Sequence, residues 1–72
     1  MNKLKRGVFV IDQFEQMMLI DDLVQIVARL PRRDNVLAGM LIKWFANRGT
    51  LSAEQQALGQ AILLRNKELL NA

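Results

Sequence analysis

The sequence contains few side chains that could carry out covalent or acid–base chemistry. Its 72 residues include no His, Cys or Tyr, so the commonest base, the thiol nucleophile and the usual zinc ligands are missing. The only serine, Ser52, stands three residues before Gln55, which is the spacing of a helix capping box. Asp21 and Asp22 are neighbours, and side chains of adjacent helical residues do not converge as a carboxylate pair must. The sequence therefore predicts no catalytic and no metal-binding residue, and a protein that is not an enzyme.

Nucleotide or cofactor binding has no support either. The glycines lack the spacing of a phosphate-binding loop, and none precedes a Lys-Ser or Lys-Thr pair. A chain of this length forms one domain, without room for a separate catalytic lobe. The four glycines are Gly7, Gly39, Gly49 and Gly59. We therefore expect no cofactor and no small-molecule substrate.

The elements that must carry any binding surface are predicted to be helices. Hydrophobic residues make up 51% of the chain, which is enough for it to fold. Asp12 and Glu15 have capping-box spacing, so a first helix is expected to begin at Asp12. The helical pattern continues to Leu30 and stops before Pro31, which disfavours a helical residue ahead of it.

Two further helices follow Pro31. Either Asp34 or Asn35 can cap a second helix that runs to about residue 48, and Gly49 stands where a left-handed C-terminal cap belongs. The Ser52 capping box then begins a third helix that reaches about Leu70.

The first eleven residues carry no helix signal. A basic tip is followed by Val8–Ile11, a run of β-branched and aromatic residues that is typical of an extended segment. We therefore expect an all-α fold, in which a three-helix bundle forms one domain (12–72) after an extended N-terminal arm (1–11). The expected helices span about 12–30, 35–48 and 52–70.

The same apolar run bears on the compartment. Val8–Ile11 stops at Asp12 and is shorter than the roughly 7–15 apolar residues of an export signal. No uncharged stretch approaches the roughly 18 residues of a transmembrane span. The sequence predicts a cytoplasmic protein that does not bind a membrane.

The first predicted helix has more apolar surface than a three-helix core readily hides. Its apolar residues cover about half of the circumference, whereas a helix with one buried face needs a stripe of roughly 100°. Phe14 and Met18 fall outside that half. A central position in the bundle would explain the wide face, but exposed patches of this kind mark interfaces with a protein partner or with a second copy in a homodimer. The candidate interface residues are Val8, Phe9, Val10, Phe14, Met18, Ile20 and Val24.

The net charge of +3 leaves nucleic acid as an alternative partner. The second and third helices can be drawn as a helix-turn-helix, with Gln55 and Gln56 near the start of a recognition helix. Glu54 lies among them and no Lys or Arg precedes Arg65, so a plain helical hairpin with solvated Gln side chains is the competing interpretation. The candidate nucleic-acid contacts are Lys3, Lys5, Arg6, Arg29, Arg32, Arg33, Lys43, Arg48, Gln55 and Gln56.

The stretch from Leu41 to Gln55 resembles a helix–Gly–turn–helix segment of the form WF…G-x-L-S-x-x-Q, which is found in small phage-encoded proteins and in proteins of phage and plasmid DNA metabolism. The resemblance implies an accessory protein that touches DNA-processing or host-defence machinery, and it carries over no catalytic residue. The leading hypothesis is a protein-binding adaptor or inhibitor of such machinery. The alternative is a small basic DNA-binding protein.

Overall fold

A computed structural model describes the backbone of residues 2–71 and the side chains of residues 13–71. Every regular element in this part of the chain is a helix, which confirms the all-α prediction. The elements are α1 (Asn2–Ile26), the 3₁₀ turn η1 (Val27–Arg29), α2 (Arg32–Arg48), α3 (Ala53–Arg65) and α4 (Lys67–Asn71).

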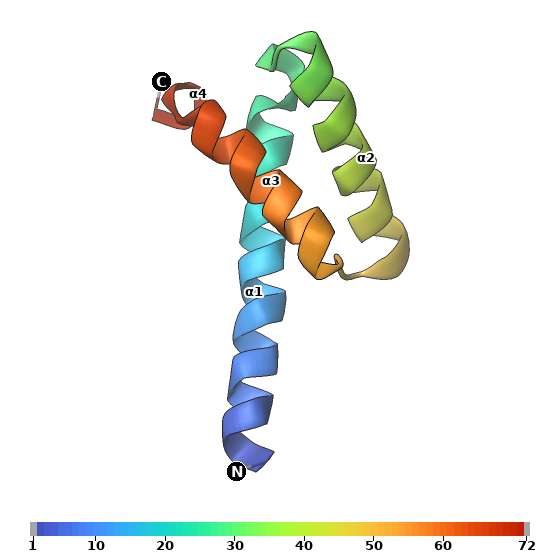
Figure 1. Cartoon of the computed structure of the whole chain (residues 1–72), viewed down its shortest axis with the longest axis vertical. Coiled ribbons are helices and arrows are strands. Elements are labelled where there is room, and N and C mark those ends of the chain that lie inside the picture. Colours follow the sequence, from blue (N-terminus) through green and yellow to red (C-terminus); the bar gives the residue numbers. More distant parts are fainter. Residues whose placement is uncertain (1, 72) are drawn as a thin grey trace.

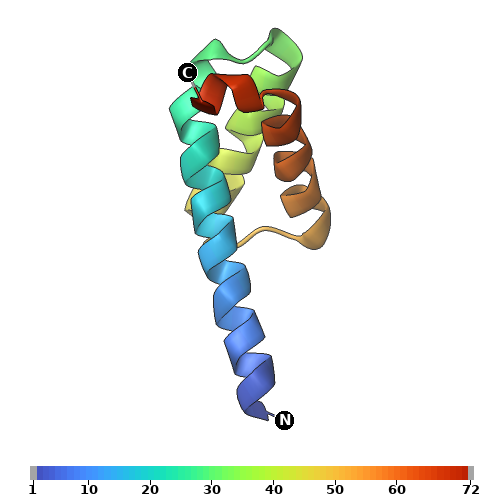
Figure 2. The same ribbon diagram turned by 90° about the vertical axis from the view of Figure 1, so that its left-hand side faces the viewer.

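Helix α1 runs along most of the molecule, whose principal extents are 43 × 25 × 17 Å. Helices α2 and α3 pack against the C-terminal half of α1 and against each other, and α4 contacts α1 near the same end (Figure 1). The N-terminal half of α1 projects beyond the other helices, as two perpendicular views show (Figure 2).

The core lies between the C-terminal half of α1 and the inner faces of α2 and α3. Four large side chains in it are fully buried, and each contributes about 1.5–3 kcal/mol by leaving water. These four are Leu23, Ile26, Leu41 and Ile62. The rest of the buried cluster consists of Leu19, Ile20, Leu30, Ala38 and Leu51.

Gly59 sets the distance between α1 and α3. It is buried, and a Cβ atom at this position would lie 3.0 Å from Leu19 Cδ2, so tight that the Leu19 side chain would have to shift by a few tenths of an ångström. Because Gly59 has no side chain, the Leu19 side chain packs directly on the α3 backbone. By contrast, a Cβ at Gly39 of α2 would meet nothing within 4 Å.

The extended N-terminal arm is not confirmed, because α1 already begins at Asn2. The segment predicted to be an arm contains good helix formers beside its β-branched residues. The helix penalty of β-branched residues is below about 0.7 kcal/mol each, so a helix that has formed further along the chain can extend through them. The predicted start at Asp12 was therefore wrong, and α1 passes through Asp21 and Asp22 without interruption.

Pro31 ends one helix and begins the next within a few residues. The α-helical part of α1 stops at Ile26, η1 follows, and Leu30 is extended, as a residue before proline prefers. Helix α2 then begins at Arg32, with Pro31 as its N-cap residue and the Pro31 carbonyl accepting from Asn35 N at 2.7 Å. The start predicted near residue 35 was late, since proline is compatible with the beginning of a helix.

The predicted third helix is divided at Asn66. The backbone at Asn66 leaves the helical region at φ −122°, and its N–H is shared between the carbonyls of Ile62 and Leu63. Ser52 caps α3 as predicted: Ser52 Oγ accepts from Gln55 N at 3.1 Å, and Gln55 Oε1 accepts from Ser52 N at 2.9 Å. Gly49 also takes its predicted role, with φ +77° at the end of α2.

Candidate protein-interaction surface

A cluster of large apolar side chains lies exposed on α1. Phe14, Met17 and Met18 are 60%, 57% and 53% exposed, and with two aspartates they line a shallow groove of about 350 Å³. The aspartates are Asp21 and Asp22. We call these five residues the α1 outer face.

Helical spacing explains why this face points away from the core. Leu19, Leu23 and Ile26 follow one another at steps of four and three residues and are buried. Phe14 and Met18 are four residues apart, and Met17 and Asp21 are likewise four apart, so they form a separate row. The helix thus carries one apolar face for folding and a second that no part of residues 13–71 covers.

The α1 outer face is acidic. Every charged residue between positions 13 and 26 is a carboxylate, namely Glu15, Asp21 or Asp22. Asp21 accepts a hydrogen bond from Gln25 Nε2 at 3.1 Å, and both side chains are exposed. A partner that covers the apolar groove therefore meets negative charge at its C-terminal end.

The structure sorts the predicted interface residues into three groups. Phe14, Met18 and Val24 are exposed, with Val24 at 50%. Ile20 was predicted wrongly: it is only 8% exposed and belongs to the core, because it lies one helical turn before Leu23 on the inner side of α1. The side chains of the other three predicted residues lie outside the described part of the chain. They are Val8, Phe9 and Val10.

Met17 was missed by the sequence analysis. It stands three residues after Phe14 and four before Asp21, a spacing that places it between them on the exposed side of the helix. The wide apolar arc of the helix obscured this signal, because the core residues and the exposed residues are both hydrophobic.

Helix α2 carries a second exposed apolar surface, of the opposite charge. Arg32, Arg33, Val36 and Leu37 line a groove of about 560 Å³, in which Val36 is 54% exposed and Leu37 half-buried. Met40 is exposed one turn further along. We call these five residues the α2 outer face.

The predicted nucleic-acid contacts do not all lie on one element. Arg32, Arg33, Lys43 and Arg48 are exposed on α2, whereas Arg29 of η1 donates to Leu69 O at 3.1 Å. The side chains of Lys3, Lys5 and Arg6 lie outside the described part of the chain.

Both glutamines of the predicted recognition helix take part in the fold. Gln55 Oε1 belongs to the Ser52 capping box, and Gln56 Oε1 accepts from Gln16 Nε2 at 3.0 Å. Both side chains are half-buried. Their amide oxygens are thus engaged within the chain, whereas a Gln that reads adenine needs its whole amide for two hydrogen bonds.

Gln16 holds the turn between α2 and α3 against α1. Its side chain is 6% exposed, and its Nε2 donates to Leu51 O at 3.0 Å as well as to Gln56. Its Oε1 accepts from Leu51 N at 3.0 Å and from Thr50 Oγ1 at 3.1 Å. The buried Gln16 amide thus donates two hydrogen bonds and accepts two, so its hydrogen-bonding capacity is fully satisfied within the fold.

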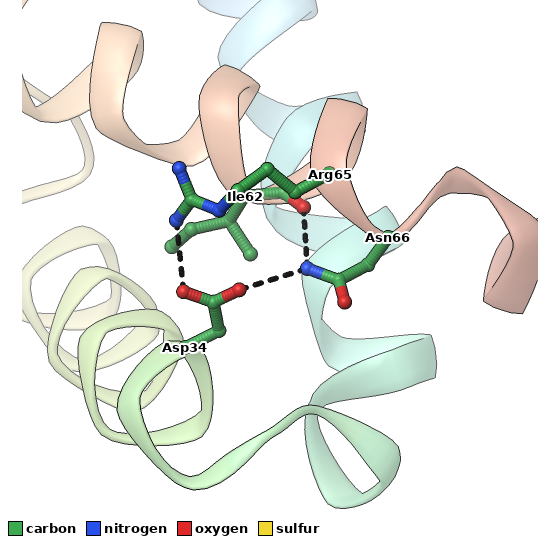
Figure 3. A network of polar contacts seen from close by, with 4 residues as sticks. All are labelled: Asp34, Ile62, Arg65 and Asn66. Atoms are coloured by element: carbon green, nitrogen blue, oxygen red, sulfur yellow. Dashed lines mark hydrogen bonds and ion pairs between the residues drawn. The ribbon is translucent and has the colours of Figure 1, made fainter.

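A second polar network, which is partly buried, joins the start of α2 to the end of α3 (Figure 3). Arg65 Nη2 donates to Asp34 Oδ1 at 2.8 Å, and Asn66 Nδ2 donates to Asp34 Oδ2 at 2.9 Å and to Ile62 O at 2.8 Å. These two donors hold the pKa of Asp34 below its ordinary value, Arg65 first and Asn66 second, although burial opposes the shift. The bond to Asp34 likewise raises the pKa of Arg65.

A groove of about 340 Å³ lies beside this network and is lined by Pro31, Arg33, Asp34 and Arg65. The only carboxylate that lines this groove, Asp34, is already paired with Arg65 and Asn66.

Asn35, the other predicted cap, donates instead to Val27 O at 2.7 Å and fixes η1 on α2. Neither Asp34 nor Asn35 caps α2, and both tie elements together.

The described side chains include no group of three His, Cys, Asp or Glu residues that could hold a metal ion. Among the helices that the structure describes, none is both long enough and apolar enough to cross a membrane. Ser52 Oγ is engaged in its cap. Two exposed apolar helix faces, on α1 and on α2, are the candidate binding surfaces of the described residues.

Fold and surface together define a small all-α protein with two oppositely charged, exposed apolar helix faces. Comparison with protein-family models, with curated proteins and with solved structures gives no match.

Proposed function

We propose that the chain is a non-enzymatic protein-binding module built on a three-helix scaffold, and that its binding surface is the α1 outer face. The observation that carries this proposal is the exposure of Phe14, Met17 and Met18 in one groove. Leaving three such side chains in water costs a protein stability and solubility, and contiguous exposed apolar patches mark interaction sites. Two methionines at the centre suit a surface that adapts to its partner.

The charge on this face indicates what the partner offers. Asp21 and Asp22 favour an apolar groove with a basic rim, into which α1 would lie as an amphipathic helix. Proteins that handle nucleic acids carry basic surfaces for phosphate contacts. An acidic helix face bound to such a surface would act as an adaptor or an inhibitor. The resemblance of residues 41–55 to proteins of phage and plasmid DNA metabolism supports the same class of partner.

The experiment combines site-specific cross-linking with point variants. A photoreactive residue at Met17 should capture a protein partner, which mass spectrometry identifies. Binding of the purified partner should then fall at least about a hundredfold for Phe14→Asp or Met18→Asp, because each variant buries a carboxylate in an apolar contact.

Leu64→Asp is the matched control. Leu64 is the most exposed large apolar residue of α3 at 73%, so the substitution makes the same chemical change away from the α1 outer face. Leu64→Asp should bind like the wild type, and all three variants should keep the helical circular dichroism spectrum. Equal loss of binding in Leu64→Asp and Phe14→Asp would contradict the proposal.

DNA binding is the second candidate function, and the cations of α2 favour it. Arg32, Arg33, Lys43 and Arg48 are exposed along this helix, and its one acidic residue, Asp34, is paired with Arg65. Such a surface should lose affinity steeply between about 50 and 200 mM salt, and Arg32→Ala with Arg33→Ala should weaken binding evenly across sequences. Absence of any DNA shift at low salt would rule this candidate out.

A further inference from the structure

The α2 outer face has the properties expected of a surface that receives the α1 outer face. Its groove, of about 560 Å³, is lined by two arginines and two aliphatic residues. The polar lining residues of one groove are Arg32 and Arg33, and those of the other are Asp21 and Asp22. Each face thus offers apolar contact together with one sign of charge.

The order of groups along the two helices also corresponds. On α1 the apolar group (Phe14, Met17, Met18) precedes the two aspartates, and on α2 the two arginines precede the apolar residues. At 1.5 Å per residue, charge and apolar centre are separated by about 8 Å on both helices. Antiparallel helices would therefore place apolar on apolar and carboxylate on guanidinium at the same time.

Within one molecule the two faces cannot meet. Helices α1 and α2 pack on each other through their core residues, among them Leu23 and Leu41. The outer-face residues Phe14, Met17, Met18, Val36 and Met40 stay exposed. The complementary surface must come from another molecule, and a second copy of this chain carries it.

We propose that the α1 outer face of one copy docks antiparallel on the α2 outer face of a second copy. This inference rests on the proposed function, because it uses the same surface of α1 and adds a second copy of the chain as a partner of that surface. The contact joins two different surfaces. Made twice about a two-fold axis, it gives an isologous reciprocal dimer; made once per copy, it is heterologous and either closes as a ring or propagates.

Charge reversal gives a test with a built-in rescue. Asp21→Arg with Asp22→Arg makes both outer faces basic, and Arg32→Glu with Arg33→Glu makes both acidic. Like charges across the contact are strongly unfavourable, so each double variant alone should self-associate at least about tenfold more weakly than the wild type in analytical ultracentrifugation. An equimolar mixture of the two double variants should regain the wild-type association, because opposite charges then face each other at both contacts.

A matched control makes the same charge changes elsewhere. Glu15→Arg and Lys67→Glu alter exposed residues that line neither groove, and both variants should associate like the wild type. Circular dichroism should show the same helix content for every variant. Self-association of the wild type should also weaken as salt is raised, since exposed charges are screened.

Three results would overturn the inference: a wild type that stays monomeric up to about 1 mM, double variants that associate as the wild type does, or a mixture that does not recover. Failure here is distinguishable from failure of the proposed function. If the wild type is monomeric but Phe14→Asp still abolishes binding of a cross-linked partner, only the second-copy inference fails. If Phe14→Asp affects no association, both fail.

Discussion

Gln16 and Leu51 are 35 residues apart in the sequence and exchange two hydrogen bonds, each 3.0 Å long. The backbone N–H of Leu51 donates to Gln16 Oε1, and Gln16 Nε2 donates to the Leu51 carbonyl. The Gln16 side chain on α1 thus supplies the hydrogen-bond partners that neighbouring backbone groups would provide to Leu51 within a helix or a sheet. Buried backbone groups must be satisfied in some way, and here one residue satisfies both groups of Leu51.

Gln16→Leu should therefore destabilise the fold by about 2–3 kcal/mol, because it leaves the buried N–H and C=O of Leu51 without partners. Gln56→Ala removes one bond of the same network and should cost about 1 kcal/mol. Urea denaturation followed by circular dichroism measures both values. Equal losses for the two variants would show that the Leu51 bonds contribute nothing.

The Asp34 network should make stability depend on pH in acid. The folded protein holds the pKa of Asp34 below its ordinary value, so the folded state binds a proton less readily than the unfolded chain. The stabilising contribution is fully present above the unfolded pKa of about 3.9 and is lost as the pH falls through the lower folded pKa.

Urea midpoints of the wild type and Asp34→Asn test this prediction. The wild type should be more stable by a constant amount between about pH 5 and 7, and the difference should shrink below about pH 4. Arg65 is half exposed, with a side chain at 53%, so high salt should reduce the difference as well. A difference that stays constant down to about pH 2 would contradict the role given to the Asp34 carboxylate.

The same substitution should destabilise the fold at Gly59 but not at Gly39. Gly59→Val should destabilise the fold by about 1–3 kcal/mol, because its Cβ already meets Leu19 tightly and the two methyl groups add further volume to a buried helix contact. Gly39→Val is the matched control within α2, where nothing lies within 4 Å of a Cβ, and it should be neutral or slightly stabilising. Thermal melts of both variants decide the point, and equal melting temperatures would refute the close contact at Gly59.

Ile20 and Met17 provide a test of which α1 face builds the core. Ile20→Ala should cost about 2–3 kcal/mol, since it removes buried methylenes and leaves a cavity. Met17→Ala should change the free energy of unfolding by less than about 0.5 kcal/mol, because the side chain is already in water. If Met17→Ala cost more stability than Ile20→Ala, the Met17 side of α1 would face the core, which would contradict the structure.

Local features of the fold were predictable, and features that join distant residues were not. The Ser52 capping box and the Gly49 cap depend on residues within one turn, so their spacing in the sequence suffices. Asp34 also had the type and place of a helix cap, yet its carboxylate turns to Arg65, 31 residues away. That choice depends on the packing of α3 on α2, which no local pattern encodes.

The candidate surface was predictable only in part for a related reason. The periodicity identified Phe14 and Met18 as residues outside the apolar arc, and both are exposed. Ile20 was expected at the interface but is buried, and Met17 was not singled out although it is exposed. A helix with apolar residues all around does not reveal where its neighbours lie. The spacing of the four glycines does not distinguish Gly59, because its role depends on the packing of Leu19 from another helix.

Gln16 and Met17 are consecutive residues with opposite surroundings, one enclosed by four hydrogen bonds and the other in solvent. Random mutagenesis of α1 would therefore show a sharp change in tolerance between adjacent codons. Under selection for soluble, folded protein, position 16 should accept almost no replacement, whereas position 17 should drift freely among polar and apolar types. If natural sequences nonetheless kept position 17 apolar, selection would be acting there on something other than folding.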